Sequence, residues 1–240
     1  MASFIPSQRE LTFSPATRLQ DSLVSGSEKR ALIWMARRTP ACINSDHLTV
    51  LGFLSQCMAG VCYALAKLNP DFLLAGIVCL ALNWFGDSLD GTLARVRNQQ
   101  RPRYGFYVDH IADTVAAFFL MGGMALSGYV HPAIAMGMLV AFLMLSIETY
   151  LATYTLGQFQ LSYWVFGPTE IRILLAIGNL ALLWHPVITL AGHRVRLFDL
   201  GGLIAILGMG LMLMISAITH TCRLYREERI PQAGSSGVAE

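Results

Sequence analysis

The sequence predicts an all-α integral membrane protein with six transmembrane helices, preceded by an amphipathic interfacial helix. Hydrophobic residues make up 55% of the 240 residues and charged residues only 13%, a balance that is unusual for a soluble domain. Apolar stretches long enough to cross a bilayer recur along the chain, since one span needs about 20 mostly apolar residues. Lysine and arginine are concentrated in the segments at one end of these stretches.

Six apolar segments predict a membrane domain over residues 41–225. Gly, Pro and Asn at 69–71 and 128–132 mark tight turns, so the spans on either side of each turn are expected to be antiparallel. An even number of spans places both chain ends on one side of the membrane. The predicted spans are at about 47–68, 71–95, 105–129, 132–156, 169–191 and 199–222.

The segments outside the membrane domain have a different composition. Residues 1–25 are rich in Ser and other polar residues and are expected to be disordered, and the tail at 226–240 is expected to be flexible. Residues 26–40 alternate apolar side chains such as Trp34 with four cations. This pattern predicts an amphipathic helix in the membrane interface, although an ordinary solvated helix is the alternative. The four cations are Lys29, Arg30, Arg37 and Arg38.

The distribution of charge predicts the orientation and excludes one class of partner. All but three of the 17 Lys and Arg residues fall on the side of the chain ends, the exceptions being Lys67, Arg194 and Arg196. Both termini and the turn after the second span are therefore expected to face the cytoplasm. A net charge of +2 without a basic run argues against nucleic acid as a partner. The five cysteines are scattered and indicate no disulfide framework.

Four aspartates are concentrated near the turn between the second and third predicted spans. Their i,i+3 and i,i+4 spacing puts each pair on one helix face, so the two pairs can converge across an antiparallel hairpin. Charge inside a membrane is costly, and four adjacent carboxylates stay ionised only with cations between them. Oxygen ligands suit Mg²⁺ or Mn²⁺ better than zinc. The pairs are Asp87 with Asp90 and Asp109 with Asp113.

Small and basic residues follow the first pair of aspartates. Gly91 leaves room for a ligand to approach the backbone, and Ala94 keeps the same face open one turn later. Arg95 adds a permanent cation that suits a phosphate. Together with the aspartates, these residues predict a pocket for a diphosphate or triphosphate group.

The spacing D-x2-D-G-x2-A-R, nine residues, then G-x3-D-x3-D resembles the signature of the CDP-alcohol phosphatidyltransferases, and every fixed position matches. The resemblance implies a six-helix, homodimeric membrane enzyme of phospholipid synthesis with a cytoplasm-facing site. Such an enzyme transfers a phospho-alcohol group from a CDP-linked donor to an acceptor hydroxyl and releases CMP. The matching residues are Asp87, Asp90, Gly91, Ala94, Arg95, Gly105, Asp109 and Asp113.

The resemblance also implies a role for each of these residues. The four aspartates would hold two divalent metal ions, Mg²⁺ or Mn²⁺, and Asp113 would also serve as the base. Thr49, in a stretch that resembles the family's entry to the first span, would contact the nucleotide, whereas capping by Asp46 is the structural alternative for this stretch. The residues implied at the CDP site are Asp87, Gly91, Ala94, Arg95 and Gly105.

The substrate branch is not fixed by the signature. One branch combines CDP-diacylglycerol with a polar alcohol, and the other combines a CDP-aminoalcohol with diacylglycerol. His110 after Asp109 resembles the choline and ethanolamine phosphotransferases, as does a looser pattern downstream, whereas the short chain and the lack of a DGKQARR run do not. The looser pattern comprises Glu148, Thr155, Gly157, Leu161, Gly167, Pro168 and Glu170.

Four residues are candidates for an acceptor or phosphate site, namely His110, Glu148, Glu170 and Arg172. Glu170 begins a helix after Gly167 and Pro168, so capping is its structural alternative. Arg172 can hold a phosphate or pair with Glu148, which lies deep in a span where ionisable residues are often functional. His220 is expected to be a helix-terminus residue.

A transporter or channel with an acidic cation site is the alternative from another functional class. Transporter sites, however, lie near the bilayer midplane, often on broken helices. The aspartates here sit beside an arginine-rich turn, which favours the enzyme.

Overall fold

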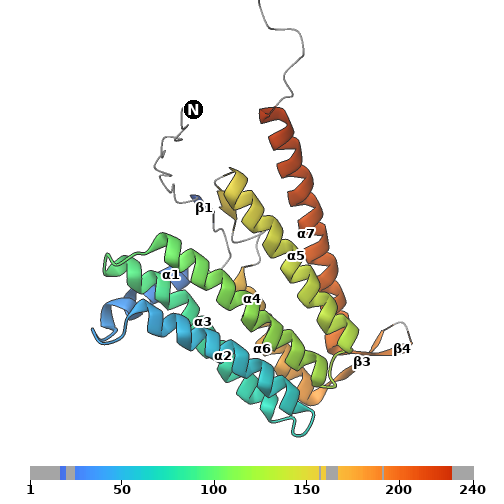
Figure 1. The fold of residues 1–240 in the computed structure, drawn as a ribbon. Helices are drawn as coiled ribbons and strands as arrows, with labels where there is room; N and C mark the ends of the chain where they lie inside the picture. Colours follow the sequence, from blue (N-terminus) through green and yellow to red (C-terminus); the bar gives the residue numbers. More distant parts are fainter. Residues whose placement is uncertain (1–16, 20–24, 157, 161–166, 191, 229–240) are drawn as a thin grey trace, which may run out of the picture.

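The computed structural model describes residues 17–19, 25–156, 158–160, 167–190 and 192–228. Seven helices and four short strands follow one another in this part of the chain (Figure 1). The helices are α1 (Ser25–Arg38), α2 (Ser45–Ala66), α3 (Phe72–Val96), α4 (Pro102–Leu126), α5 (Pro132–Leu156), α6 (Pro168–Trp184) and α7 (Leu197–Glu227). The strands are β1 (Thr17–Leu19), β2 (Gln158–Gln160), β3 (Val187–Leu190) and β4 (His193–Arg196). The all-α membrane fold class is confirmed.

Five helices in the described part of the chain, α2, α3, α4, α5 and α7, are long and apolar enough to cross a membrane. The predicted span at 169–191, the fifth along the chain, is not among them, so the count of six is not confirmed. Helix α6 has 17 residues, or about 25 Å at 1.5 Å per residue, against a hydrocarbon core of about 30 Å. It ends at Trp184 instead of reaching 191 because Pro186 lacks a backbone donor and restricts His185.

The helices alternate in direction, so their ends fall into two groups. The turns at 67–71 and 127–131 lie at one end of the bundle together with the β3–β4 hairpin (Figure 1). The opposite end holds α1, the start of α2, and the connection between α3 and α4. The end of α7 lies toward this second end as well. The predicted antiparallel turns are therefore confirmed.

Helix α2 is the centre of the inner bundle, because α3 and α4 both pack along it while making few contacts with each other. Two glycine pairs allow the close approach. A Cβ on Gly123 of α4 would lie 1.9 Å from the carbonyl oxygen of Gly60 on α2, and one on Gly86 of α3 would lie 2.6 Å from the amide nitrogen of Gly52. Backbone-to-backbone packing of this kind depends on small residues at the helix interface.

A buried polar pair connects α6 to this bundle. Tyr63 on α2 donates its hydroxyl hydrogen to the side-chain oxygen of Asn179 on α6 over 2.8 Å, and both residues are fully enclosed. The amide of Asn179 donates in turn to the backbone oxygen of Leu73. Buried polar groups require such partners, and these contacts fix the rotation of α6 against α2 and α3.

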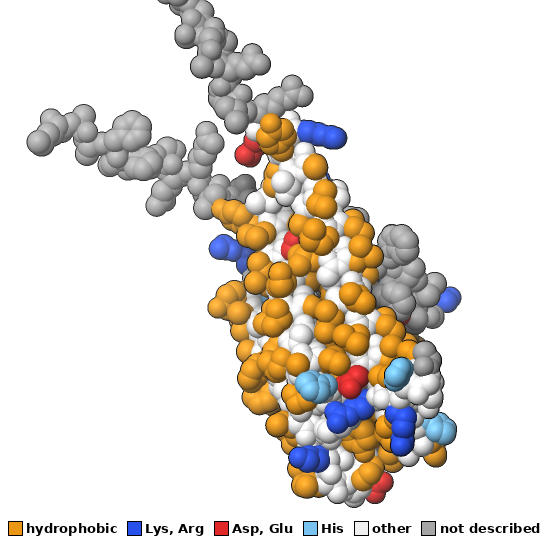
Figure 2. Space-filling view, turned by 90° about the vertical axis from the view of Figure 1, so that its right-hand side faces the viewer, with side chains coloured by type: hydrophobic (Ala, Val, Ile, Leu, Met, Phe, Trp, Pro, Cys, Tyr) orange, Lys and Arg blue, Asp and Glu red, His pale blue; other side chains and the backbone are white. Residues whose placement is uncertain are grey.

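Helices α5 and α7 form a second layer, since α7 packs mainly along α5. The outward side of α7 exposes apolar residues at Ile204, Leu207 and Leu211. Figure 2 shows this side as a largely apolar face, with basic and histidine side chains gathered toward its lower end. An apolar outer surface is what a membrane-spanning helix presents to lipid.

The helix predicted at 26–40 is present as α1, and it packs against the bundle through Leu32 and Ala36. The side chain of Glu28 accepts hydrogen bonds from the Trp84 indole on α3, at 2.7 Å, and from the Thr169 hydroxyl on α6, at 2.9 Å. Trp34 and the cationic residues beside it are exposed. This arrangement agrees with the predicted interfacial helix, whose depth in a membrane stays a prediction.

The chain ends lie mostly outside the described residues, as do Gly157 and Leu161. Within the predicted disordered segment, residues 17–19 form β1, which pairs in parallel with β2. Helix α7 continues to Glu227, just inside the predicted tail. Disorder of the rest of 1–25 and flexibility of 229–240 stay predictions.

Candidate active site

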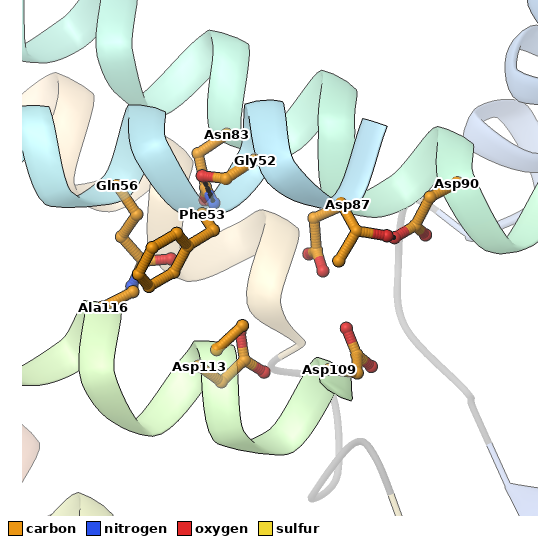
Figure 3. A pocket seen from close by; sticks show the side chains of 11 residues that line it. Gly52, Phe53, Gln56, Asn83, Asp87, Asp90, Asp109, Asp113 and Ala116 are labelled. Atoms are coloured by element: carbon orange, nitrogen blue, oxygen red, sulfur yellow. Dashed lines mark hydrogen bonds between the residues drawn. The ribbon is translucent and has the colours of Figure 1, made fainter. Parts of the chain in front are cut away.

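The four aspartates face one another across a pocket between α3 and α4. Asp87 and Asp90 project from the last turns of α3, and Asp109 and Asp113 project from the third and fourth turns of α4 (Figure 3). Electrostatic interactions connect Asp113 with the other three carboxylates and with Arg172. The predicted convergence of the two pairs is therefore present in the geometry.

Helix α2 forms one wall of the pocket, which the spacing of the aspartates did not predict. The spacing predicted that the pairs converge across an α3–α4 hairpin, and they do face one another, but α3 and α4 both pack on α2 and make few contacts with each other. Gly52, Phe53 and Gln56 of α2 line the pocket (Figure 3). The contact of Gly52 with Gly86 brings α2 against α3 at the turn that carries Asp87.

Thr49 on α2 lines the pocket, whereas the contact with the nucleotide that the family resemblance implies stays a prediction. The Thr49 hydroxyl donates to the Oδ2 atom of Asp90 over 2.6 Å. The predicted cap at Asp46 is absent, because Asn44 caps α2 by accepting from the His47 amide over 3.2 Å. Asp46 pairs instead with Arg101. Thr49 is thus positioned to orient one carboxylate of the pocket.

Arg172 reaches the aspartates from α6. Its Nη2 atom lies 2.5 Å from the Oδ2 atom of Asp87, and its Nε atom donates to the side-chain oxygen of Asn83 over 2.7 Å. Arg172 therefore pairs with Asp87, and the pairing with Glu148 that the sequence left open is not formed. A cation beside four carboxylates reduces their mutual repulsion.

The small residues of the signature leave open space beside the pocket. A Cβ on Gly105 would meet nothing within 4 Å, and one on Gly91 would meet only the Arg95 side chain, at 3.8 Å. Arg95 is exposed and donates to the Thr92 hydroxyl over 3.1 Å. Gly91, Ala94, Arg95 and Gly105 do not line the pocket itself. They lie at the end of α3 and the start of α4.

His110 faces α5 rather than the pocket. Its ring stacks on Phe106, with centroids 4.1 Å apart, and meets the Tyr150 ring of α5 edge-on at 4.8 Å. The Nδ1 atom lies 2.5 Å from the Phe106 carbonyl oxygen. Tyr150 interacts electrostatically with Asp109 and Asp113, so a residue of α5 that no sequence pattern singled out lies beside the site.

Glu148 and Glu170 have partners away from the pocket. Glu148 on α5 lies 2.6 Å from the Nδ1 atom of His220 on α7, so His220 pairs across helices and does not only terminate one. Glu170 accepts from the Gly167 amide over 2.9 Å and so satisfies a backbone donor at the start of α6. The contact of Glu170 matches its structural alternative, whereas Glu148 pairs with His220 and not with Arg172.

Several pocket residues were missed because their signals were weak. Asn83 is an amide in an apolar run, one helical turn before Asp87, and this spacing was the available clue. Gly52 and Gly86 have no individual signature, since a glycine in a helix marks a close approach only when its partner is known. The missed residues that line the pocket are Gly52, Phe53, Gln56, Asn83, Ala112 and Ala116.

The carboxylate oxygens of the four aspartates are suitable ligands for hard divalent cations, although they do not converge on a single ion position. Among the described residues, no three His, Cys, Asp or Glu side chains come together tightly enough to enclose an ion. The aspartates instead flank a pocket, and all the oxygens they offer are of the type that Mg²⁺ and Mn²⁺ prefer. Mg²⁺ commonly uses one or two carboxylates together with water and substrate phosphates. The open arrangement suits ions that are shared with a phosphate ligand.

Comparisons with known proteins agree with this site. Residues 43–221 match the CDP-alcohol phosphatidyltransferase family profile, and this stretch contains all four aspartates. The chain is also 27% identical over 194 residues to an archaetidylinositol phosphate synthase of Pyrococcus horikoshii, covering 80% of this chain and 87% of that protein. The family match extends over most of the chain, from the linker before α2 into the last turns of α7. The protein is therefore a member of the CDP-alcohol phosphatidyltransferase family.

Proposed function

We propose that this protein transfers a phospho-alcohol group from a CDP-linked donor to an acceptor hydroxyl and releases CMP, as a step in phospholipid synthesis. The observation that carries the proposal is the placement of Asp87, Asp90, Asp109 and Asp113 around one pocket. Family membership supports the same chemistry. The aspartates lie at the end of the bundle where α3 ends and α4 begins, which favours an enzyme over a transporter or channel.

The aspartates are assigned to two divalent cations, Mg²⁺ or Mn²⁺. When bound, such ions neutralise the charge that develops on the leaving phosphate. Thr49 orients the carboxylate of Asp90 through its 2.6 Å hydrogen bond. Gly91, Ala94 and Gly105 provide the space in which the cytidine diphosphate lies, and the guanidinium of Arg95 neutralises its phosphate charge.

Asp113 is proposed as the base. It accepts the proton of the acceptor hydroxyl as the new bond between that oxygen and phosphorus forms and the bond to the CMP oxygen breaks. Its place one turn beyond Asp109, facing α3 across the pocket (Figure 3), supports this role. A base must lie within hydrogen-bond reach of the proton that it removes.

The acceptor side is assigned to His110 and Arg172. The contact of Arg172 with Asp87 supports the assignment of Arg172, because it places the guanidinium at the pocket. His110 follows Asp109 in the chain and faces α5, where it contacts Tyr150. Glu148 and Glu170, the other two candidates from the sequence, are engaged by His220 and by the Gly167 amide, so we assign them to holding α7 and the start of α6.

Two kinds of observation bear on the donor, and they favour different branches. The name of the Pyrococcus relative describes a lipid joined to a phosphorylated polyol, which favours a lipid-linked CDP donor and a polar acceptor. His110 and the GPTE sequence favour a CDP-aminoalcohol donor and diacylglycerol. We propose the first branch for testing first, because that relative matches most of the chain.

The test is CMP release by purified protein in lipid nanodiscs, with Mg²⁺ or Mn²⁺ and one donor at a time. CDP-diacylglycerol is combined with inositol phosphate, glycerol phosphate or serine, and CDP-choline or CDP-ethanolamine with diacylglycerol. CMP release that needs both donor and acceptor, and that EDTA abolishes, is expected for one branch. No CMP from any donor would contradict the proposed function.

The assembly and orientation are also proposals. We propose a homodimer in the membrane, with the site and both termini in the cytoplasm. Native mass spectrometry in nanodiscs measures the assembly. Exposed Cys42 lies at the site end, so its labelling by an impermeant maleimide in inside-out but not right-side-out vesicles tests the orientation.

A further inference from the structure

The contact between Arg172 and Asp87 puts a guanidinium where a divalent cation is proposed to bind. The Arg172 side chain is 14% exposed and that of Asp87 is 27% exposed, so the pair is only partly shielded from solvent. The bond joins α6 to α3. It also places one permanent positive charge beside the four carboxylates, which reduces their mutual repulsion without a metal ion.

Asn83 holds the other end of the guanidinium. It is buried, with 4% of its surface exposed, and its amide nitrogen donates to the backbone oxygen of Gly52 over 3.0 Å. This bond turns the amide oxygen toward Arg172, whose Nε atom donates to it over 2.7 Å. The Nε atom of Arg172 is thus held by Asn83 of α3, which is itself bonded to α2. The Nη2 atom contacts the carboxylate of Asp87.

A guanidinium and a divalent cation both bind the oxygen atoms of Asp87 and repel each other. We propose that Arg172 is a displaceable counter-ion: it occupies Asp87 when no metal is bound and leaves this carboxylate when a cation takes it. Asn83 is the positioning residue that keeps Nε in place during the exchange. The inference rests on the proposed function, because it takes Asp87 as a metal ligand.

The released guanidinium has a defined next partner. A guanidinium carries five N–H donors in a rigid fork that matches a phosphate. With Nε still held by Asn83, the Nη atoms turn from Asp87 toward a phosphate in the same pocket. Cation binding therefore converts Arg172 from a partner of the protein into a partner of the substrate, and couples metal binding to phosphate binding.

The experiment measures Mn²⁺ binding directly, by the electron paramagnetic resonance signal of free Mn²⁺, with the full chain in neutral-lipid nanodiscs. Arg172→Gln is expected to bind Mn²⁺ about 3- to 10-fold more tightly than wild type, because a competing charge is removed. Arg172→Lys keeps the charge and is expected to remain close to wild type. Arg101→Gln is the matched control, since it removes an arginine that pairs with Asp46 outside the pocket.

Thermal unfolding in EDTA and in saturating Mn²⁺ distinguishes this role from a purely structural one. Arg172→Gln is expected to lower the melting temperature in EDTA and to gain more than wild type from Mn²⁺. Weaker or unchanged Mn²⁺ binding by a folded Arg172→Gln protein would overturn the inference while the metal site stands. Absence of Mn²⁺ binding by wild type would instead contradict the metal assignment in the proposed function. An Asn83→Ala variant with wild-type Mn²⁺ binding and a wild-type KM for the donor would overturn the positioning role of Asn83.

Discussion

The hydroxyl of Thr49 on α2 donates to the Oδ2 atom of Asp90 on α3 over 2.6 Å. The contact crosses the interface at which Gly52 and Gly86 bring the two helices together. One carboxylate of the site is therefore oriented from a helix that carries none of the four aspartates. The other oxygen of Asp90, Oδ1, accepts from the Gly91 amide, so the hydroxyl of Thr49 holds one of the two carboxylate oxygens.

Replacement of Thr49 by Val is expected to lower CMP release about 10- to 100-fold, because a hydrogen bond to a charged group contributes about 1.5 to 3 kcal/mol. Val keeps the shape of Thr and removes only the hydroxyl donor. The measurement is the rate of CMP release over a titration of Mg²⁺. Thr49→Ser is the control, since it restores the donor, and equal rates for Val and wild type would show that the bond does not matter.

Asp113→Asn is expected to abolish transfer while donor binding is largely retained. A general base contributes about 10²- to 10⁴-fold to the rate, and asparagine cannot accept the proton. CMP release gives the rate, and calorimetric titration with the donor gives the affinity. Near-normal turnover in this variant would refute the assignment of Asp113 as base, whereas loss of donor binding would place its main role in the metal site.

Gly86→Ala is expected to reduce both stability and activity. The added Cβ would lie 2.6 Å from the Gly52 amide nitrogen and 2.6 Å from the Leu48 carbonyl oxygen, so α2 and α3 must separate. Overpacking of this kind costs about 1 to 3 kcal/mol. The measurements are the melting temperature in nanodiscs and CMP release at a temperature where the variant is folded.

Gly122→Ala is the matched control for Gly86→Ala, because a Cβ at Gly122 meets nothing within 4 Å. Both changes add one methyl group to a long apolar helix. A similar loss for the two variants would mean that helix propensity or expression causes the effect, and that the α2–α3 contact does not.

The pair of Glu148 and His220 is expected to stabilise the contact between α5 and α7. Glu148→Ala and His220→Ala should each lower the melting temperature, because each removes one side chain of the 2.6 Å contact. The double variant should lose less than the sum of the two. Coupling within a contacting pair is about 0.5 to 3 kcal/mol, and strictly additive losses would argue against a direct interaction.

The sequence was sufficient to predict the positions of the four aspartates, because the spacing that defines them lies within single helices. The i,i+3 spacing of Asp87 and Asp90 and the i,i+4 spacing of Asp109 and Asp113 each define one helix face. Alternation of apolar segments with turns was enough to order the helices. Neither inference needs a contact between residues far apart in the chain. In the structure, the two aspartate-bearing faces meet at one pocket.

The supporting contacts could not be predicted because they join residues far apart in the chain. The contact of Asn83 with Arg172 spans 89 positions, and the approach of Gly52 to Gly86 depends on how two whole helices cross. The end of α6 was placed too late for a different reason. Hydropathy continues past Trp184 into β3, and the stop at Pro186 was given too little weight.

The packing of α3 and α4 on α2, rather than on each other, gives α2 a further consequence. The contacts of Gly52 with Gly86 and of Gly60 with Gly123 set how closely α3 and α4 approach α2. A bulkier residue at Gly52 or Gly60 would push α3 or α4 away from α2 and move one pair of aspartates relative to the other without altering any ligand atom. Helix α2 thus acts as a spacer between the two halves of the site, although it carries none of the four aspartates.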